Sequence, residues 1–130
     1  MSGNSYLLDT NIAIAILAGE IDLQARRDQG QRVLLCPTVI GELIYGAEKS
    51  ARPRPNLERL RVLSEKCELM VQDEGTAHHY GRIKASLRRR GRPIPGNDVW
   101  IAASAVQHDL VLATRDAHFQ YVEGLTVIRW

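Results

Sequence analysis

The chain has 130 residues, 45% hydrophobic and 25% charged, which is the composition of one ordinary globular domain spanning residues 1–130. At this length a chain buries roughly two thirds of the surface that its unfolded form exposes, so its core needs no disulfide or metal. No apolar stretch reaches the ~18 residues of a membrane span, and the start at Met1–Ser5 lacks the basic region of a secretory signal. We therefore expect a cytoplasmic protein with no membrane segment. Cys36 and Cys67 lack Cys-x-x-Cys spacing and are expected to be reduced thiols.

The net charge of +2 hides a strong asymmetry along the chain. Of the 17 Lys and Arg residues, six lie between Arg82 and Arg92 with no acid among them, and the remaining 11 stand against 15 Asp and Glu, a balance of −4. A basic strip beside an acidic remainder suits an enzyme that binds a phosphate backbone and acts on it with carboxylates. A solvated helix end explains the strip equally well.

Short apolar runs alternate with longer helical patterns along the whole chain. In chain order we expect a strand at 6–8, a helix at 10–18, a polar connection around 26–30, a strand at 33–36, a helix at 37–50, a break at Pro53 and Pro55, a short helix at 57–63 and a buried strand at 69–71. A helix from 74 into the arginine cluster follows, then a loop at 91–96, a buried helix at 97–106 whose interior from 99 to 106 has no charge, a strand at 111–113 and an edge strand at 126–128. Such alternation predicts the α/β class, with a mainly parallel sheet covered on both faces.

Four acids are expected to meet at one edge of this sheet. In open parallel sheets the ligand site lies beyond the carboxyl ends of the strands. Asp9 ends the first strand, and Asp116 follows the strand at 111–113. Glu42 lies about one turn into the helix after the second strand, and Asp98 opens the helix at 97–106. We expect all four side chains at this edge.

Such a cluster favours a bound cation. Two carboxylates ~5 Å apart repel by about 3 kcal/mol at an effective dielectric constant near 20. Hard oxygen ligands favour Mg²⁺ or Mn²⁺ over zinc, and such ions activate water and shield an attacked phosphodiester in many nucleases. Asn11 and Thr114 could hydrogen-bond that water or orient the acids.

Each acid also has a plainer explanation. Asp9 and the pair Asn97 and Asp98 are residue types that cap helices. Glu42 could be a flanking residue of its helix, and Asp116 could form a turn. Capping is compatible with metal binding, and coincidence explains four acids at one edge poorly.

The histidines carry little signal in the sequence. His78, His79 and His108 lack metal-ligand spacing. His118 lies two residues after Asp116 and could approach the site, but a histidine on a surface turn is the favoured interpretation. Phosphate-binding glycine loops and a Gly-x-Ser-x-Gly motif are both missing from the sequence, so dinucleotide-binding, P-loop and serine-hydrolase functions have no support.

Four segments together resemble the motifs of PIN-domain ribonucleases, most closely the VapC-type toxins of toxin–antitoxin pairs. In order, they are Leu7–Asn11, Glu42–Gly46, Asn97–Ala103 and Thr114–Phe119. The resemblance spans nearly the whole chain and implies a three-layer α/β/α sandwich with a mainly parallel sheet of about five strands. It further implies Mg²⁺- or Mn²⁺-dependent endonucleolytic cleavage of RNA, a homodimer, and inhibition by a cognate antitoxin protein.

The resemblance also assigns roles to residues of this chain. Asp9, Asp98 and Asp116 would hold the metal, Glu42 would bind metal or position water, and Asn11 and Thr114 would be supporting polar groups. The candidates for contact with RNA phosphates are the clustered arginines Arg88, Arg89, Arg90 and Arg92.

Two other classes of function are compatible with acids at strand ends. Phosphoryl transfer to an aspartate, as in dehalogenase-type phosphatases, resembles Asp-x-Asp at the first strand, whereas position 11 here is Asn. A module that sequesters RNA or a protein without cutting could use the same fold.

Overall fold

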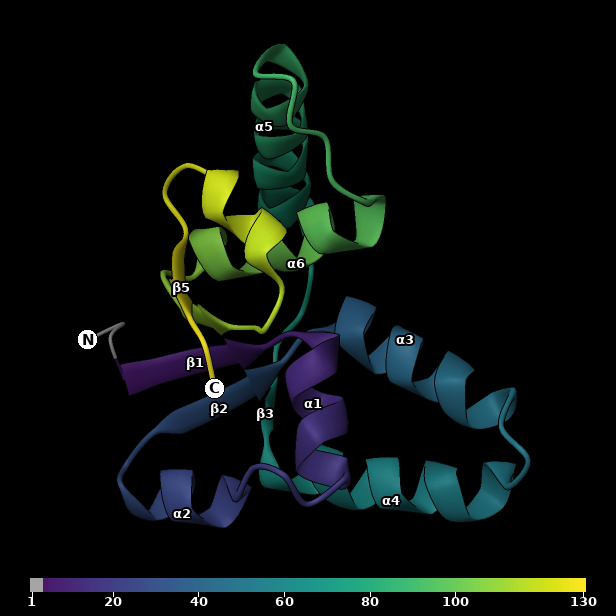
Figure 1. Ribbon diagram of the computed structural model, residues 1–130. Helices are drawn as coiled ribbons and strands as arrows, with labels where there is room; N and C mark the ends of the chain where they lie inside the picture. Colours follow the sequence, from purple (N-terminus) through teal and green to yellow (C-terminus); the bar gives the residue numbers. More distant parts are fainter. Residues whose placement is uncertain (1–3) are drawn as a thin grey trace.

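The computed structural model describes residues 4–130 and is built on a five-stranded, all-parallel sheet (Figure 1). The strands lie in the order β3-β2-β1-β4-β5. Their bounds are β1 Ser5–Leu8, β2 Arg32–Leu35, β3 Glu68–Leu69, β4 Val111–Ala113 and β5 Thr126–Ile128. The first three residues, on which part of the expectation about a secretory signal depends, lie outside the described residues.

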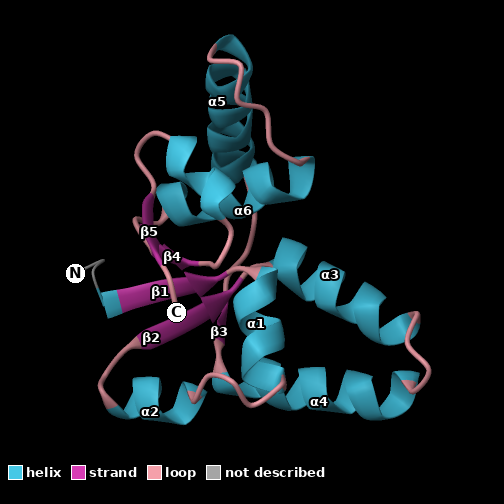
Figure 2. Ribbon diagram, in the orientation of Figure 1, coloured by secondary structure: helices cyan, strands magenta, loops and turns pink. Residues whose placement is uncertain are grey.

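Helices cover both faces of the sheet, as the sequence predicts. They are α1 Thr10–Leu17, α2 Leu23–Asp28, α3 Pro37–Glu48, α4 Pro53–Lys66, α5 Glu74–Arg89, α6 Gly96–Gln107 and the 3-10 helix η2 Ala117–Tyr121. Figure 2 shows α5 and α6 on one side of the sheet and α1, α2 and α4 on the other. The α/β/α sandwich is confirmed. Among the described residues 4–130, no helix is long and apolar enough to cross a membrane.

The core follows from the apolar pattern of the central elements. All four residues of β1 are buried, because the strand is paired on both edges and covered on both faces. The interior of α6, residues 99–106, carries no charge and is mostly buried, as its composition predicts, because the helix packs against α5 and approaches the sheet at β4. Phe119 of η2 is fully buried. Cys36 and Cys67 are free thiols.

Two expectations about helices were wrong. Pro53 and Pro55 do not break the chain but begin α4, which extends to Lys66 rather than over 57–63 alone. Proline is tolerated in the first turn of a helix, because the amide hydrogens there have no partner within the helix. The polar connection around 26–30 contains part of the short helix α2, which Asp22 caps by accepting a hydrogen bond from the amide of Ala25 over 3.1 Å.

The third strand also differs from the prediction. The apolar run predicts a buried strand at 69–71, but β3 is Glu68–Leu69 and both residues are exposed. It lies at the edge of the sheet and pairs only with β2 in the described part of the chain. Leu69 is 59% exposed and Val71 is 70% exposed, so apolar character alone did not distinguish an edge strand from a central one.

The order of the strands places a topological switch point between β1 and β4. The chain first adds strands outward on one side of β1, to β2 and β3, and then crosses over to β4 on its other side. At the carboxyl ends of β1 and β4, Leu8 pairs with Ala113, and the amide of Asp9 donates to the carbonyl of Ala113 over 3.0 Å. Such a switch point is where ligands bind in open α/β sheets.

Candidate active site

Asp9 lies at this switch point, immediately after β1. One carboxylate oxygen caps α1 by accepting the Thr10 amide hydrogen over 2.8 Å. The other accepts hydrogen bonds from Thr114 Oγ1 over 2.7 Å and from Asn11 Nδ2 over 3.2 Å. Asp9 therefore does cap α1, as the plainer explanation holds. Capping uses one oxygen of the carboxylate, and the other oxygen faces Thr114 and Asn11.

Burial controls the ionisation of Asp9, whose exposure is only 4%. Burial raises the pKa of this carboxyl, and the negative charges of Asp98 and Glu42 raise it further. The hydrogen bonds from Thr114 and the Thr10 amide oppose this rise. Two acids from distant parts of the sequence thus help to raise the pKa of Asp9.

Glu42 reaches the same site from the second turn of α3. Its Oε1 accepts a hydrogen bond from Thr10 Oγ1 over 2.7 Å. Thr10 follows Asp9 directly, so this contact joins the start of α1 to α3. Sequence reasoning missed Thr10 as a site residue, although a hydroxyl next to Asp9 was a usable signal.

Asp98 lies in the first turn of α6 rather than at its cap. The helix begins at Gly96 and its N-cap is Pro95, so the interpretation of Asn97 and Asp98 as the cap was wrong. Because the positive end of the helix dipole lies at its first turn, an acid is stabilised there. Burial nevertheless raises the pKa of Asp98, and Asp116 and Glu42 add to the rise against a lowering contact with His118.

Asp116 caps η2 and, with Asp98, encloses a histidine. Its Oδ1 accepts the amide hydrogen of His118 over 3.2 Å, so the turn-forming role expected of an aspartate here is present. The ring of His118 lies 2.7 Å from Asp116 through Nδ1 and 2.7 Å from Asp98 through Nε2. The favoured interpretation of His118 as a surface-turn histidine was therefore wrong.

The supporting polar groups connect the ends of β1 and β4. Thr114 is 2% exposed and, besides donating to Asp9, accepts the amide hydrogen of Asp116 over 3.0 Å. Asn11 Oδ1 accepts the amide hydrogen of Arg115 over 3.1 Å. Both residues therefore fix the segment that carries Asp116 relative to Asp9.

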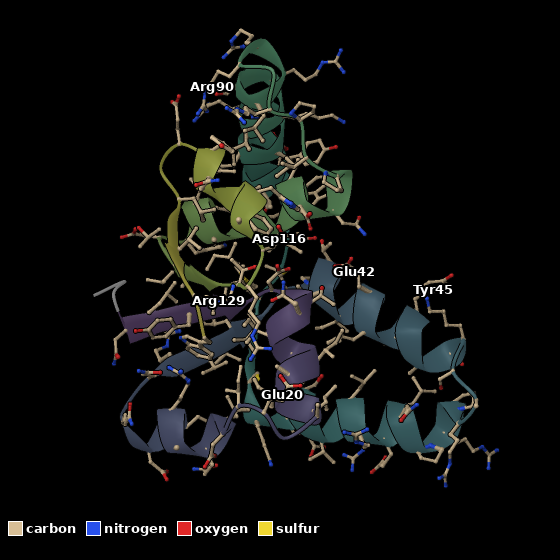
Figure 3. The ribbon with its side chains drawn as sticks, in the orientation of Figure 1. Glu20, Glu42, Tyr45, Arg90, Asp116 and Arg129 are labelled. Atoms are coloured by element: carbon tan, nitrogen blue, oxygen red, sulfur yellow. The ribbon has the colours of Figure 1, made fainter. Side chains whose placement is uncertain are left out.

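The structure brings all four predicted acids together at one end of the sheet. Figure 3 shows Asp116 and Glu42 near the start of α1, with Tyr45 farther along α3. One ligand atom from each of Asp98, Asp116 and His118 lies within 4.8 Å of the others, which is close enough to hold one metal ion. The donor set of carboxylates with one imidazole fits a hard or borderline divalent cation.

The predicted arginines lie elsewhere. Arg88 and Arg89 are exposed in the last turn of α5, and Figure 3 shows Arg90 at the tip of that helix, away from Asp116. Arg90 donates to the carbonyl of Tyr121 over 2.6 Å, and the guanidinium of Arg92 lies 4.1 Å from the centre of the Tyr121 ring. The structure therefore does not bring the arginines together with the acids.

The parallel sheet of this strand order, with acids gathered at its switch point, agrees with the resemblance of the sequence to PIN domains. Residues 6–125 match the PIN domain family. The chain belongs to that family. It is 34% identical over 129 residues to the tRNA(fMet)-specific endonuclease VapC of Shigella flexneri, covering 96% of this chain and 97% of that protein. It is 31% identical over 130 residues to ribonuclease VapC1 of Haemophilus influenzae strain R2866, with the same coverage, 96% and 97%.

Solved structures agree with these sequence relatives. The DNA-bound VapBC complex of Salmonella typhimurium contains a chain that superposes with a TM-score of 0.91 at 31% identity, covering 97% of this chain and 98% of that one. The VapBC-1 complex of nontypeable Haemophilus influenzae gives a TM-score of 0.87 at 30% identity, with the same coverage, 97% and 98%. Within the PIN domain family, the chain is thus a member of the VapC group.

Proposed function

We propose that this chain is a metal-dependent endoribonuclease that acts as the toxin of a toxin–antitoxin pair. The observation that carries the proposal is the meeting of four carboxylates from distant segments at the β1–β4 switch point, two of them with raised pKa values. Acids that raise one another's pKa values destabilise a fold when nothing compensates their charges, and they are tolerated where a cation binds. The ribonuclease names of the relatives support the same reaction.

Asp9, Asp98 and Asp116 would hold Mg²⁺ or Mn²⁺, and Glu42 would bind the metal or position the attacking water. When bound, the cation would lower the pKa of a water and shield the charge of the attacked phosphodiester. Thr114 and Asn11 would keep the Asp9 carboxylate aimed at the site through the hydrogen bonds of 2.7 and 3.2 Å. Thr10 would do the same for Glu42 over 2.7 Å.

Contact with RNA would involve the basic tip of α5. Arg88 and Arg89 are exposed there and free to reach a phosphate backbone that extends from the site. Arg90 and Arg92 would first have to leave their contacts with Tyr121. The Shigella relative is named for tRNA(fMet), which makes tRNA the first substrate class to test.

A cognate antitoxin would cover the apolar surface beside the acids. A groove of about 350 Å³ between α1, α3 and α4 is lined by both Ile14 and Glu42, and Ile14 is 54% exposed. Nearby on α3, Tyr45 is 66% exposed. A protein segment in this groove would bury apolar area and lie against Glu42. The solved VapBC complexes of related proteins support such a partner. We further propose that the chain forms a homodimer and is located in the cytoplasm.

Cleavage of RNA by the purified, antitoxin-free chain tests the proposal. Bulk tRNA and total RNA are incubated with the protein and Mg²⁺, Mn²⁺ or EDTA, and the products are resolved by gel. We expect discrete fragments with either metal and intact RNA with EDTA. Folded protein that binds these RNAs and leaves their length unchanged with both metals would favour a sequestering module instead.

A further inference from the structure

His118 has a position that the nuclease chemistry of the four acids does not require. Each of its ring nitrogens lies 2.7 Å from a different carboxylate, Nε2 from Asp98 Oδ2 and Nδ1 from Asp116 Oδ1. The two acids come from different elements, α6 and the cap of η2. The imidazole thus lies between them.

The local fold keeps the ring in this place. Asp116 caps η2 and so fixes the first turn of that helix. Phe119, the next residue, is fully buried and anchors η2 in the core. The rings of His118 and Phe119 lie 5.1 Å apart between centres. The backbone that presents His118 is therefore held on both sides of the residue.

The two nitrogens face different surroundings. Asp98, beside Nε2, interacts electrostatically with Glu42, and Asp9 in turn interacts with Asp98 and Glu42. Nε2 therefore lies beside the acid that interacts with Glu42 and Asp9, whereas Nδ1 lies beside Asp116. Histidines that bind metals in proteins commonly donate their second ring N–H to a carboxylate, which orients the ring.

We propose that His118 is a ligand of the metal through Nε2, with Nδ1–H donating to Asp116, and that this nitrogen makes the site prefer Mn²⁺ to Mg²⁺. The proposal rests on the proposed function only in assuming that the acids bind a divalent cation. Mg²⁺ strongly prefers oxygen ligands and gains little from imidazole, whereas imidazole binds the later first-row divalent metals well. Carboxylates alone would discriminate weakly between the two ions.

The test uses Mn²⁺ bound to the full-length, antitoxin-free chain without RNA. Pulsed electron paramagnetic resonance of Mn²⁺ detects the ¹⁴N nucleus of a bound imidazole, and titrations give the Kd of Mn²⁺ and of Mg²⁺. His118→Gln removes the nitrogen ligand and keeps a hydrogen-bonding side chain. The matched control is His108→Gln, because His108 is exposed at the end of α6.

We expect ¹⁴N modulation in the wild type and in His108→Gln, and none in His118→Gln. The Kd of Mn²⁺ should rise about tenfold or more in His118→Gln, the range typical of lost metal-site interactions, while the Kd of Mg²⁺ changes much less. Absence of ¹⁴N modulation in the wild type would overturn the proposal. Equal weakening of both metals in His118→Gln would also overturn it, because that is the effect of a residue that only orients carboxylates.

Two further measurements keep the test decisive. If His118→Gln does not fold, the variant His78→Gln/His79→Gln/His108→Gln leaves His118 as the single histidine of the four in the chain, and it must retain the ¹⁴N signal. Since neither readout involves RNA, a chain that binds Mn²⁺ through His118 but cuts no RNA would lose the proposed function and keep this inference. A chain that cuts RNA with metal but shows no ¹⁴N signal would keep the proposed function and lose this inference.

Discussion

Replacing Thr114 with valine tests whether one buried hydroxyl holds the acids of the site in place. Thr114 is 2% exposed, donates to Asp9 Oδ2 over 2.7 Å and accepts the amide hydrogen of Asp116 over 3.0 Å. Valine has nearly the same shape but no hydroxyl, so both hydrogen bonds are lost, together with a longer one of 3.4 Å from Asn11 Nδ2, while the packing stays nearly the same.

The size of the effect follows from these contacts. A hydrogen bond to a charged group contributes about 1.5–3 kcal/mol and a neutral one about 1 kcal/mol. The added methyl group of valine returns about 0.8 kcal/mol by burial. We therefore expect Thr114→Val to lose about 2 kcal/mol of the free energy of unfolding, or about 8 °C in Tm for a domain of this size. The lost hydrogen bond also lowered the pKa of Asp9, so that pKa rises further and metal binding at fixed pH weakens.

Thermal unfolding and Mg²⁺ titration measure both effects. The matched control is Thr126→Val, because Thr126 is exposed in β5. We expect the control to unfold like the wild type and to bind Mg²⁺ equally well. If Thr114→Val lies within about 0.5 kcal/mol of Thr126→Val in stability and has the same Mg²⁺ affinity, the Thr114 hydroxyl does not organise the site.

Three further predictions follow from the charges and surfaces. In the folded, metal-free chain the pKa of Asp98 is raised, so the folded state retains this proton to higher pH than the unfolded state. The free energy of unfolding therefore falls as pH rises from about 4 through the raised pKa. Thermal unfolding at pH 7 in EDTA should show Asp98→Asn to be more stable than the wild type. Arg88→Ala/Arg89→Ala should weaken RNA binding across sequences and reduce the slope of log K against log salt by about 1.5 to 2, measured by fluorescence anisotropy. Ile14→Arg, at a side chain that is 54% exposed, should weaken co-purification with the cognate antitoxin while RNA cleavage persists.

Each of these predictions has a control and an outcome against it. Mg²⁺ should erase the advantage of Asp98→Asn by stabilising only the wild type, and a variant less stable than wild type in EDTA would contradict the electrostatic argument. Arg52→Ala/Arg54→Ala removes two exposed arginines at the start of α4. This variant should reduce the slope of log K against log salt less than the double variant of α5 does. Val71→Arg, at a side chain that is 70% exposed near β3, should leave the antitoxin complex intact. Equal effects of test and control would refute the corresponding assignment.

The positions of Asp9 and Glu42 could be anticipated from the sequence because they depend on local rules. An acid that ends an apolar strand and starts a helix lies at the carboxyl edge of a parallel sheet, and the helix period sets where Glu42 projects. The uncharged stretch at 99–106 likewise had to be buried. These predictions use only short stretches of chain and the class of the fold.

Other features depended on partners far away in the sequence. Whether β3 is buried depends on what pairs with its second edge, and nothing near Leu69 contains that information. His118 reaches Asp98, 20 residues away, only because η2 folds back over the start of α6. The α4 boundary was misjudged for a local reason, since Pro53 can begin a helix as well as end one.

The comparison of Asp98→Asn with Asp109→Asn in RNA cleavage tests the central claim most directly. Both changes replace one aspartate with asparagine, but Asp98 lies in the acid cluster whereas Asp109 is exposed after α6 with φ 53°, a conformation that asparagine tolerates. With Mg²⁺ or Mn²⁺, we predict that Asp98→Asn lowers the cleavage rate at least about 100-fold and that Asp109→Asn cuts like the wild type. Undiminished, metal-dependent cleavage by folded Asp98→Asn would contradict the account.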